Sequence, residues 1–452
     1  MTADVFAVAS EIVERAAPGE CLEVYVSTGT ETEIRAYQGE VESLTSASSS
    51  GVGVRVLLEG ADGARVGFAS AGSLAPDVID QVLSDARDNA RFATPDDMVA
   101  FAVPDGIAPV ELVLEDPSLA SMSTERKIAL ALELERVARA ADPRVRQIDE
   151  ASYGDAIGES ALASTTGIRA SARRSVSWLS LAAIANGQGR DQTGYSSKAA
   201  RSADGLDVEA TALDAVGRAT RMLGATKPSS ARCPIVFDPR VTATLLAVVS
   251  SALSGEAVTK GRSFFADRMR EVVAAPSVTV VDDPTDPRHL SASRVDGEGL
   301  ACRRNVLIDH GVLSSFVFDT VSARRAGMTS TGSAVRGGYA GTPTAGCRAL
   351  HFEPGELDAD AILALVGDGV YVQSVTGVHS GVNPISGDFS VGAEGLRITG
   401  GVLAEPIREM TVASTLQRLL LDVAAIGSDV EWLPGVAAGQ TLAISDAAVS
   451  GS

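Results

Sequence analysis

The pattern of apolar and polar residues at the start of the chain changes from a helical period to a strand period. Residues 1–20 have the amphipathic pattern of a helix. Residues 22–27 then alternate between apolar and polar side chains, which predicts a strand with one buried face. Two further extended stretches lie on either side of Asp62-Gly63, a dipeptide that accepts the positive φ of a tight hairpin turn. A β-meander is therefore predicted after the first helix.

Helical spacing returns at residues 73–93, where the apolar side chains form one stripe. Ser73 is predicted as the N-cap of this helix, with Pro76 in its first turn. Residues 94–117 contain four prolines and little periodicity, as expected of a linker or an edge segment. The pattern thus indicates a first unit that ends before a proline-rich connection.

A second unit with the same order of elements follows. Residues 123–141 have helical spacing, with Ser123 as the cap, although Arg126 occupies the position where a capping box has Glu or Gln. Extended stretches over 145–185 and a helical pattern over 204–224 complete the unit. Both N-terminal units are predicted as helix, strands and helix, although their residues show no convincing repeat.

The clearest boundary in the chain is the polar segment 227–234, and a strand-rich part follows it. Residues 328–346 are rich in Gly, Ser and Thr and poor in bulky side chains, so we expect them to follow the surface or line a cleft. The other predicted elements are a strand at 234–238, a buried helix at 241–253, a strand at 277–283, a hairpin with arms at 303–309 and 312–319 around His310-Gly311, two strands within 396–413 that meet at Gly400-Gly401, and a helix at 414–427.

A chain of 452 residues is expected to form two or three domains. Hydrophobic residues make up 45% of the chain and aromatic residues only 4%, so Ala, Val, Leu and Ile must build the cores. The predicted fold class is α+β, with N-terminal helix/β-meander units followed by a strand-rich, glycine-rich C-terminal domain. The expected domains are an N-terminal unit at 1–105, a second α+β unit at 106–226 and the C-terminal domain at 230–452.

The charge of the chain excludes some classes of partner. Its net charge of −20 repels phosphate backbones and anionic lipids, so neither direct nucleic-acid binding nor membrane binding is expected. The N-terminus lacks the basic and apolar regions of a secretory signal, and the most apolar run, 241–255, is too short to span a bilayer. A cytoplasmic protein is therefore expected.

A metal site made by this chain alone is disfavoured. The four cysteines include no CxxC pair, which favours buried free thiols. The histidines occur singly along the chain, without HExxH, HExxxH or a spacing that would bring two onto one helical face. Isolated histidines are more often structural or surface residues than ligands. The four histidines are His289, His310, His351 and His379.

The segment 377–395 contains one histidine, two carboxylates and three serines among five glycines. A catalytic interpretation would use Ser380 or Ser386 with His379 and Asp388. Neighbours on an extended segment point to opposite faces, however, and the chain has no GxSxG elbow here. Glycines suit tight turns and close backbone approach, so we favour a segment that shapes a site without performing its chemistry. The glycines at 336–341 match no phosphate-binding loop either.

Four stretches, at 39–57, 277–287, 295–319 and 377–416, closely resemble the TldD/PmbA family, and within it the PmbA branch, also called TldE. This family was once labelled modulator of DNA gyrase. The resemblance implies a heterodimeric zinc protease whose TldD subunit has HExxxH on a helix and a cysteine near its C-terminus. The TldE subunit lacks these residues and completes an enclosed chamber. Members are associated with trimming peptide-antibiotic precursors and degrading antitoxins.

Transferred to this chain, the metal helix corresponds to Leu245–Gly255, which contains no His or Glu. The cysteine region corresponds to 432–445, which contains no Cys. The resemblance therefore implies a chain that neither holds zinc nor activates water. We assign it no catalytic residue and no cofactor, and expect zinc in the partner subunit. The expected partners are a TldD-like catalytic subunit with HExxxH and unfolded peptide substrates.

A chamber that accepts varied peptides can bind them through main-chain hydrogen bonds to an exposed strand. We expect six residues to face the chamber or the partner, although they could instead only stabilise internal turns. Two other hypotheses are a stand-alone homodimer that binds peptides or proteins without cleaving them, and an independent hydrolase that uses the His379 region. The six residues are His379, Ser380, Asn383, Asp388, Arg336 and Tyr339.

Overall fold

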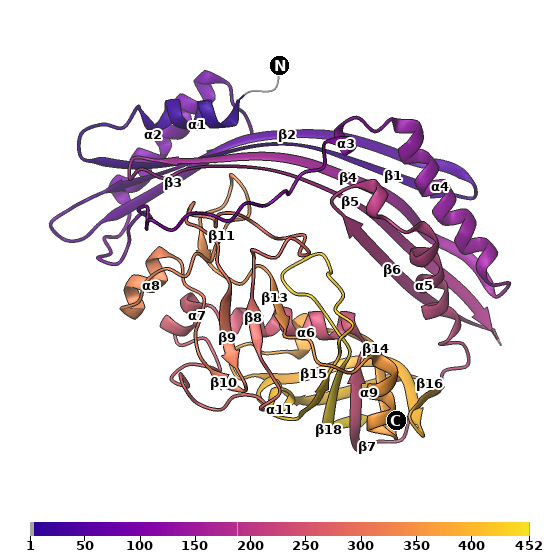
Figure 1. The fold of residues 1–452 in the computed structure, drawn as a ribbon. Coiled ribbons are helices and arrows are strands. Elements are labelled where there is room, and N and C mark those ends of the chain that lie inside the picture. Colours follow the sequence, from indigo (N-terminus) through magenta and orange to yellow (C-terminus); the bar gives the residue numbers. More distant parts are fainter. Residues whose placement is uncertain (1–3, 188, 452) are drawn as a thin grey trace.

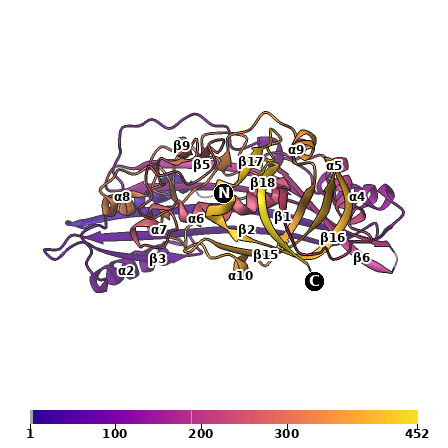
Figure 2. The same cartoon turned by 90° about the horizontal axis from the view of Figure 1, so that it is seen from below.

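The computed structural model describes residues 4–187 and 189–451. A long, curved β-sheet formed by the N-terminal half lies across a C-terminal domain of shorter strands and helices (Figure 1). Seen from the side of the C-terminal domain, the long strands run behind it (Figure 2). The α+β fold class predicted from the sequence is confirmed.

The N-terminal sheet has six strands in the order β3-β2-β1-β4-β5-β6. The two units expected from the sequence both contribute to it, because the first strand of each, β1 and β4, pair antiparallel from Glu23 opposite Ser164 to Arg35 opposite Ser152. The strands are β1 (Glu20–Tyr37), β2 (Glu40–Leu58), β3 (Arg65–Ala71), β4 (Val145–Ser164), β5 (Arg169–Gly187) and β6 (Arg190–Ala200).

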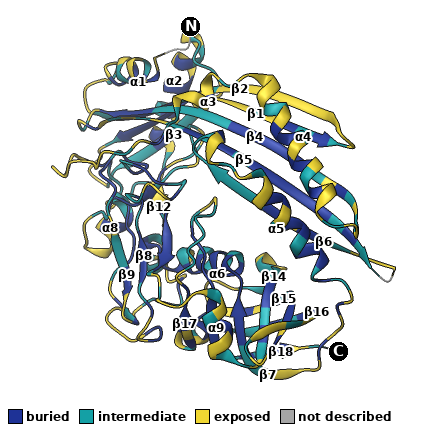
Figure 3. Cartoon of the chain, turned by 45° about the vertical axis from the view of Figure 1, so that its right-hand side comes forward, coloured by how far each residue is buried: buried dark blue, intermediate teal, exposed yellow. Residues whose placement is uncertain are grey.

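Helices cover one face of this sheet. The even-numbered residues at the start of β1 and the odd-numbered residues of β4 and β5 pack against them, as the period of two in a strand requires. Figure 3 shows the buried strands beneath helices whose outer faces are exposed. The other face is turned toward the C-terminal domain. The helices are α1 (Val5–Val13), α2 (Pro76–Phe92), α3 (Pro117–Ala120), α4 (Thr124–Ala141) and α5 (Val208–Thr220), with a 3-10 turn at Ala203–Gly205.

The capping predictions for the two units have different outcomes. Ser123 caps α4 as predicted, because its hydroxyl accepts a hydrogen bond from the Arg126 backbone N–H. The prediction for Ser73 is wrong: Ala75 is the N-cap of α2, and the Ser73 hydroxyl instead accepts a hydrogen bond from the Ala75 backbone N–H. Pro76 at the first helical position sets this later start, since its fixed φ suits that position.

The C-terminal domain is built around a sheet that closes on itself. Its strand order is β16-β15-β14-β7-β18-β17, and β16 also pairs with β18, so five strands form a ring. The strands are β7 (Ala231–Phe237), β14 (Gly369–Thr376), β15 (Asp388–Thr399), β16 (Val402–Thr415), β17 (Val423–Ile426) and β18 (Leu442–Ser450).

Smaller sheets and helices surround this ring and share its core. The smaller strands are β8 (Val280–Asp282), β9 (Asn305–Asp309), β10 (Val312–Leu313), β11 (Ala334–Val335), β12 (Thr344–Ala345) and β13 (Leu350–Phe352). The helices are α6 (Pro239–Ala252), α7 (Gly255–Thr259), α8 (Thr320–Ala326), α9 (Ala359–Val366), α10 (Val378–Gly381) and α11 (Leu416–Leu421). Within the described ranges, no helix is both long and apolar enough to cross a membrane.

Two predicted elements of the C-terminal domain are shorter than expected. The helix predicted at 414–427 ends at Leu421, and the next residues form β17, which pairs with β18 and buries Val423 and Ile426. The turn at His310-Gly311 is confirmed, because both residues have positive φ. The second arm of that hairpin is a strand only at Val312–Leu313.

Candidate functional site

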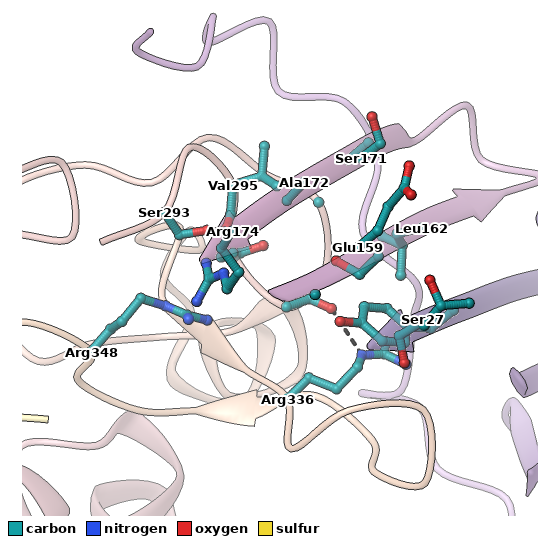
Figure 4. A pocket seen from close by; sticks show the side chains of 18 residues that line it. Ser27, Glu159, Leu162, Ser171, Ala172, Arg174, Ser293, Val295, Arg336 and Arg348 are labelled. Atoms are coloured by element: carbon teal, nitrogen blue, oxygen red, sulfur yellow. Dashed lines mark hydrogen bonds between the residues drawn. The ribbon is translucent and has the colours of Figure 1, made fainter. Parts of the chain in front are cut away.

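A cavity of about 250 Å³ lies between the uncovered face of the N-terminal sheet and the C-terminal domain. Strands β1, β4 and β5 form one wall, and residues 293–299 with Arg336 and Arg348 form the other (Figure 4). A second cavity of about 540 Å³ lies further along the same face of the sheet. Gly158 and Arg174 line both cavities, so the two are adjacent. We call the two cavities together the inter-domain cleft.

Three arginines that have no paired carboxylate in the described ranges line the inter-domain cleft. The guanidinium groups of Arg174 and Arg348 point toward each other in the first cavity, while the Glu159 carboxylate points away from them (Figure 4). Arg201 lines the second cavity. Burial lowers the pKa of Arg174, and the nearby charges of Arg348 and Arg201 lower it further. Three arginines therefore line a cleft that the carboxyl groups of Glu159, Asp296 and Glu31 also line, in a chain of net charge −20.

Arg336 also lines the first cavity, but its charge is paired with a carboxylate. Its guanidinium forms an ion pair with Glu23, and both side chains are only 2% exposed. Glu23 also binds Arg55, the residue opposite it on β2, at 3.0 Å. Burial acts to raise the pKa of Glu23, but Arg55 and Arg336 outweigh burial, and the pKa is lowered. This buried triad joins the C-terminal domain to the N-terminal sheet.

Three buried carboxyl groups lie near the cleft or just behind it. Burial raises the pKa of Asp282 and that of Asp296 to about 6 each. Burial and the neighbouring carboxyls of Asp296 and Asp319 raise the pKa of Glu298 to about 8. The oxygens of Asp296 accept hydrogen bonds from the backbone N–H groups of residues 298, 300 and 334. Asp296 thus shapes the loop that lines the first cavity.

Tyr339, the other residue singled out in segment 328–346, packs on the N-terminal sheet. A Cβ atom at Gly51 of β2 would lie 2.5 Å from the Tyr339 ring, and one at Gly53 would lie 2.1 Å from the Tyr339 carbonyl oxygen. Arg336 and Tyr339 therefore both lie where the two halves of the molecule meet, and only Arg336 lines a described cavity.

The segment 377–395 is not uniformly extended as assumed. Residues 378–381 form the short helix α10, in which His379 and Ser380 are exposed. Asn383, also exposed, accepts hydrogen bonds from the backbone N–H groups of residues 385 and 386, and Ser386 donates to Asp388 at 2.6 Å. In the described part of the chain, His379 makes no hydrogen bond to these serines, and no hydrogen bond or ion pair joins this segment to Arg336 or Tyr339.

Two of the four histidines, single in the sequence, meet in the structure. The ring centroids of His289 and His351 lie 6.1 Å apart, and both rings contact Trp432. Burial lowers the pKa of His289 to about 4, so its imidazole is neutral near pH 7. Across the described ranges, no three potential ligand side chains (His, Cys, Asp or Glu) form a cluster suited to a metal ion. Neutral rings packed on an indole are typical of an apolar core.

The residues around α6 do not fit a zinc ion. The helix Pro239–Ala252 contains no His, Cys, Asp or Glu, and the side chains of Leu245, Leu246 and Val249 are buried in the core. The soft ligand Cys347 lies beside this helix, where its thiol contacts the Ser250 carbonyl oxygen at 3.9 Å. Burial raises the pKa of Cys347 well above its usual range, so it is a thiol and not the thiolate that zinc requires.

Sequence reasoning missed Arg174, Arg201 and Arg348. Their signal is weak, because single arginines occur throughout the chain. The alternation of β5 does place Arg174 on the face opposite the helices, but it does not show what lies across from that face. Only the docking of the C-terminal domain brings the three arginines together.

Three domain families match the chain. Residues 22–90 match PmbA/TldA metallopeptidase domain 1, residues 117–223 the central domain, and residues 230–451 the C-terminal domain. Together these matches cover most of the chain.

Individual proteins agree with these matches. The chain is 28% identical over 427 residues to the metalloprotease PmbA of Escherichia coli O157:H7, covering 93% of this chain and 90% of that protein. It is 26% identical over 398 residues to a metalloprotease TldD homolog of Haemophilus influenzae, covering 85% and 81%. The crystal structure of TldE from Thermococcus kodakarensis superposes with a TM-score of 0.87 at 21% identity over 99% of both chains, which shows a shared fold.

Proposed function

Because the chain belongs to the PmbA/TldD metallopeptidase family, we propose that it is the non-catalytic, TldE-type subunit of a heterodimeric zinc metalloprotease. A TldD-type partner with HExxxH binds the zinc ion and activates the water. This chain completes the chamber in which unfolded peptides, such as peptide-antibiotic precursors or antitoxins, are processed.

The single observation on which this proposal depends is the chemistry of α6. In the alignment suggested by the family resemblance, this helix takes the place of the zinc-binding helix. Its side chains are apolar or hydroxyl-bearing, and Leu245, Leu246 and Val249 are at most 2% exposed. Hydrolysis of a peptide by a zinc-bound water needs deprotonated or neutral ligands and a base, and this helix supplies none.

Two features of the N-terminal sheet support a role in binding an extended peptide or a partner. Residues 40–49 of β2 are all exposed (Figure 3). Strand β3 pairs only with residues 52–58 of β2, so within the described structure residues 40–49 have no strand on their outer side. Residues 47 and 49 also line the larger cavity of the inter-domain cleft. An unpaired strand edge beside a cleft suits main-chain recognition of varied sequences.

Co-purification from the native cell, followed by protease assays, tests the proposal. We expect this chain to be recovered with a HExxxH subunit, and the pair to contain zinc and cleave unfolded peptides. The isolated chain should show neither property. If the isolated chain cleaves peptides and chelators abolish the cleavage, the proposal is wrong. Recovery of a homodimer that binds peptides, from a cell without such a partner, would support the stand-alone binding protein instead.

The residues of segment 377–395 can be tested in the same pair. We expect the double substitution His379→Ala and Asn383→Ala to weaken assembly or lower turnover, because both side chains are exposed on a segment that we propose faces the partner or the chamber. His310→Ala is the control, since this histidine is also exposed but lies in a tight turn elsewhere. If assembly and turnover are unchanged in the double variant, these two residues do not face the partner or the chamber.

A further inference from the structure

The arginines of the inter-domain cleft have an unusual feature: Arg174, Arg201 and Arg348 form no ion pair within the described residues. Their neighbours differ. Arg173, one position earlier on β5, pairs with Glu115 at 3.3 Å, and Arg336 in the same cavity pairs with Glu23. The chain has an excess of acidic side chains, with a net charge of −20. A shortage of carboxylates therefore does not explain the three unpaired arginines.

The hydrogen bonds of the three guanidinium groups leave most of their donors free. Among residues 4–187 and 189–451, Arg174 donates only to the Ala292 carbonyl oxygen, at 3.3 Å. In the same ranges the Arg348 side chain donates only to the Ala334 carbonyl oxygen, at 3.4 Å. Arg201 is held more firmly and donates to three carbonyl oxygens, including that of His289 at 2.7 Å. A guanidinium has five N–H donors, so Arg174 and Arg348 retain donors directed into the cavity.

In the part of the chain that the structure describes, the carboxyl groups around these arginines form no ion pair with them, although Arg348 acts to lower the pKa of Asp282 and Asp296. Glu31, which lines the second cavity, is also unpaired there. Both oxygens of Asp296, which lines the same cavity, accept backbone N–H groups. One oxygen of Asp282 accepts the backbone N–H groups of residues 348 and 349. The Glu159 carboxylate points away from Arg174 and Arg348 (Figure 4). Half-buried, mutually repelling cations are costly unless an anion joins them.

We infer that Arg174, Arg348 and Arg201 form a binding site for the carboxylate of a peptide, at the junction of the two cavities of the inter-domain cleft. The planar fork of a guanidinium matches a carboxylate with two parallel hydrogen bonds. Arg174 lines both cavities and is the central residue, with Arg348 on one side and Arg201 on the other. The inference rests on the proposed function in one respect: the proposed function is the reason for taking the ligand to be a peptide.

The carboxylate has two sources, the C-terminus of a peptide and an acidic side chain. Three matched, fluorescently labelled peptides without secondary structure separate them. The first has a free C-terminus and no acidic residue, the second is its C-terminal amide, and the third is the amide with one internal Asp. Binding of each to the isolated full-length chain is measured by fluorescence anisotropy. We expect the first or the third peptide to bind at least about tenfold more tightly than the second, as for a charge-assisted pair.

Substitutions test whether the arginines cause the preference for a carboxylate peptide over the amide. Arg174→Gln and Arg348→Gln should each reduce the affinity for the carboxylate peptide to that for the amide. Arg173→Gln is the matched control, because it removes the neighbouring charge on the other face of β5 and should leave the preference intact. Thermal unfolding checks that the variants fold, and the loss of mutual repulsion should keep the Tm of Arg174→Gln at or above that of the unsubstituted chain.

Three results would each overturn the inference. The first is equal affinity for all three peptides, and the second is no binding of a carboxylate peptide at millimolar concentration. The third is a preference that is unchanged in both Arg174→Gln and Arg348→Gln. The proposed function fails separately. If the pair with the HExxxH subunit needs this chain for cleavage but the chain shows no carboxylate preference, only the inference is wrong. If the preference exists but the chain contributes nothing to cleavage, only the proposed function is wrong.

Discussion

Adjacent arginines on β5 illustrate how one step along a strand changes the environment of a side chain. Arg173 lies on the helix-covered side of the sheet, where its side chain is 60% exposed and paired with Glu115. Arg174 points into the inter-domain cleft, where burial and two other arginines lower its pKa. The alternation of faces follows from the sequence. The difference in electrostatics follows only from what lies opposite each face.

Glu298 makes a residue-scale prediction about pH. Its pKa is raised to about 8 in the folded protein from an ordinary value of 4.5, chiefly by burial and then by Asp296 and Asp319. The folded state therefore binds this proton more tightly than the unfolded chain. The resulting stabilisation is fully present below about pH 4.5 and is lost as the pH rises through about 8. Asp282 and Asp296, raised to about 6, act in the same direction.

Glu298→Gln keeps the shape of the side chain and removes the titration. We expect the variant to be more stable than the unsubstituted chain by a few kcal/mol at about pH 9 and to differ little at about pH 5. Urea unfolding at both pH values measures this. Glu111→Gln, at an 87% exposed side chain, is the control and should change nothing. A pH dependence that is the same in Glu298→Gln and the unsubstituted chain would contradict the assignment.

At the scale of elements, glycines on β2 allow the segment 336–341 to approach the sheet. Gly51 and Gly53 lie on the face opposite the helices, directly against Tyr339. The sequence indicated that segment 328–346 is too poor in bulky residues to pack by itself. In the structure this segment packs on strand β2, which has glycines, and therefore no side chains, at the points of contact.

Gly53→Ala should displace this segment. The added Cβ atom would lie 2.1 Å from the Tyr339 carbonyl oxygen, which belongs to the backbone and cannot rotate away. We expect a loss of about 1–3 kcal/mol in the free energy of unfolding, as for overpacking of a core. Gly217→Ala in α5 is the control: its Cβ atom meets nothing within 4 Å, so it should be neutral or stabilising by up to about 1 kcal/mol. Denaturant unfolding distinguishes the two, and equal stabilities would contradict the proposed contact.

At the scale of the whole molecule, buried ion pairs fasten the N-terminal sheet to the C-terminal domain in two places. Near β1 and β2, Glu23 binds Arg336 and Arg55. Near α5, Arg218 binds Asp238 at 2.7 Å, and Tyr371 donates to the same carboxylate at 2.8 Å. The inter-domain cleft lies on the face of the sheet that these contacts hold against the C-terminal domain, so we expect its geometry to depend on them.

Glu23→Gln tests the first of these attachments. The substitution leaves Arg55 and Arg336 buried without a counter-charge, which should cost about 3–5 kcal/mol of stability. The same carboxylate makes the unsubstituted protein sensitive to acid: because its pKa is lowered in the folded state, its contribution is present above pH 4.5 and is lost as the pH falls through the folded value.

The control for Glu23→Gln is Glu133→Gln, which breaks an exposed pair with Arg136 and should have no measurable effect. Calorimetry of both variants measures the change. If Glu23→Gln unfolds at the same temperature as the unsubstituted chain, the triad does not hold the two parts together.

Much of the fold follows from local patterns. The sequence correctly predicted the order of helix, strands and helix in both N-terminal units. It also correctly predicted the turns at His310-Gly311 and Gly400-Gly401 and the buried helix near 241–253. The errors have local causes as well. The predicted helix at 414–427 ends early because Val423–Ile426 gains more from pairing with β18 than from continuing the helix. Ala75, and not Ser73, is the N-cap of α2, because Pro76 favours the first position of the helix.

The sequence by itself determined most of the elements, the alternation of faces along the strands and the lack of zinc ligands within α6, because these depend on residues close together in the chain. The tertiary structure alone decided which groups meet. Arg174 and Arg348, or His289 and Trp432, are separated by more than a hundred residues, and no periodicity links them. They converge because the curved sheet packs on the C-terminal domain, which buries apolar surface and charged groups from distant parts of the chain together.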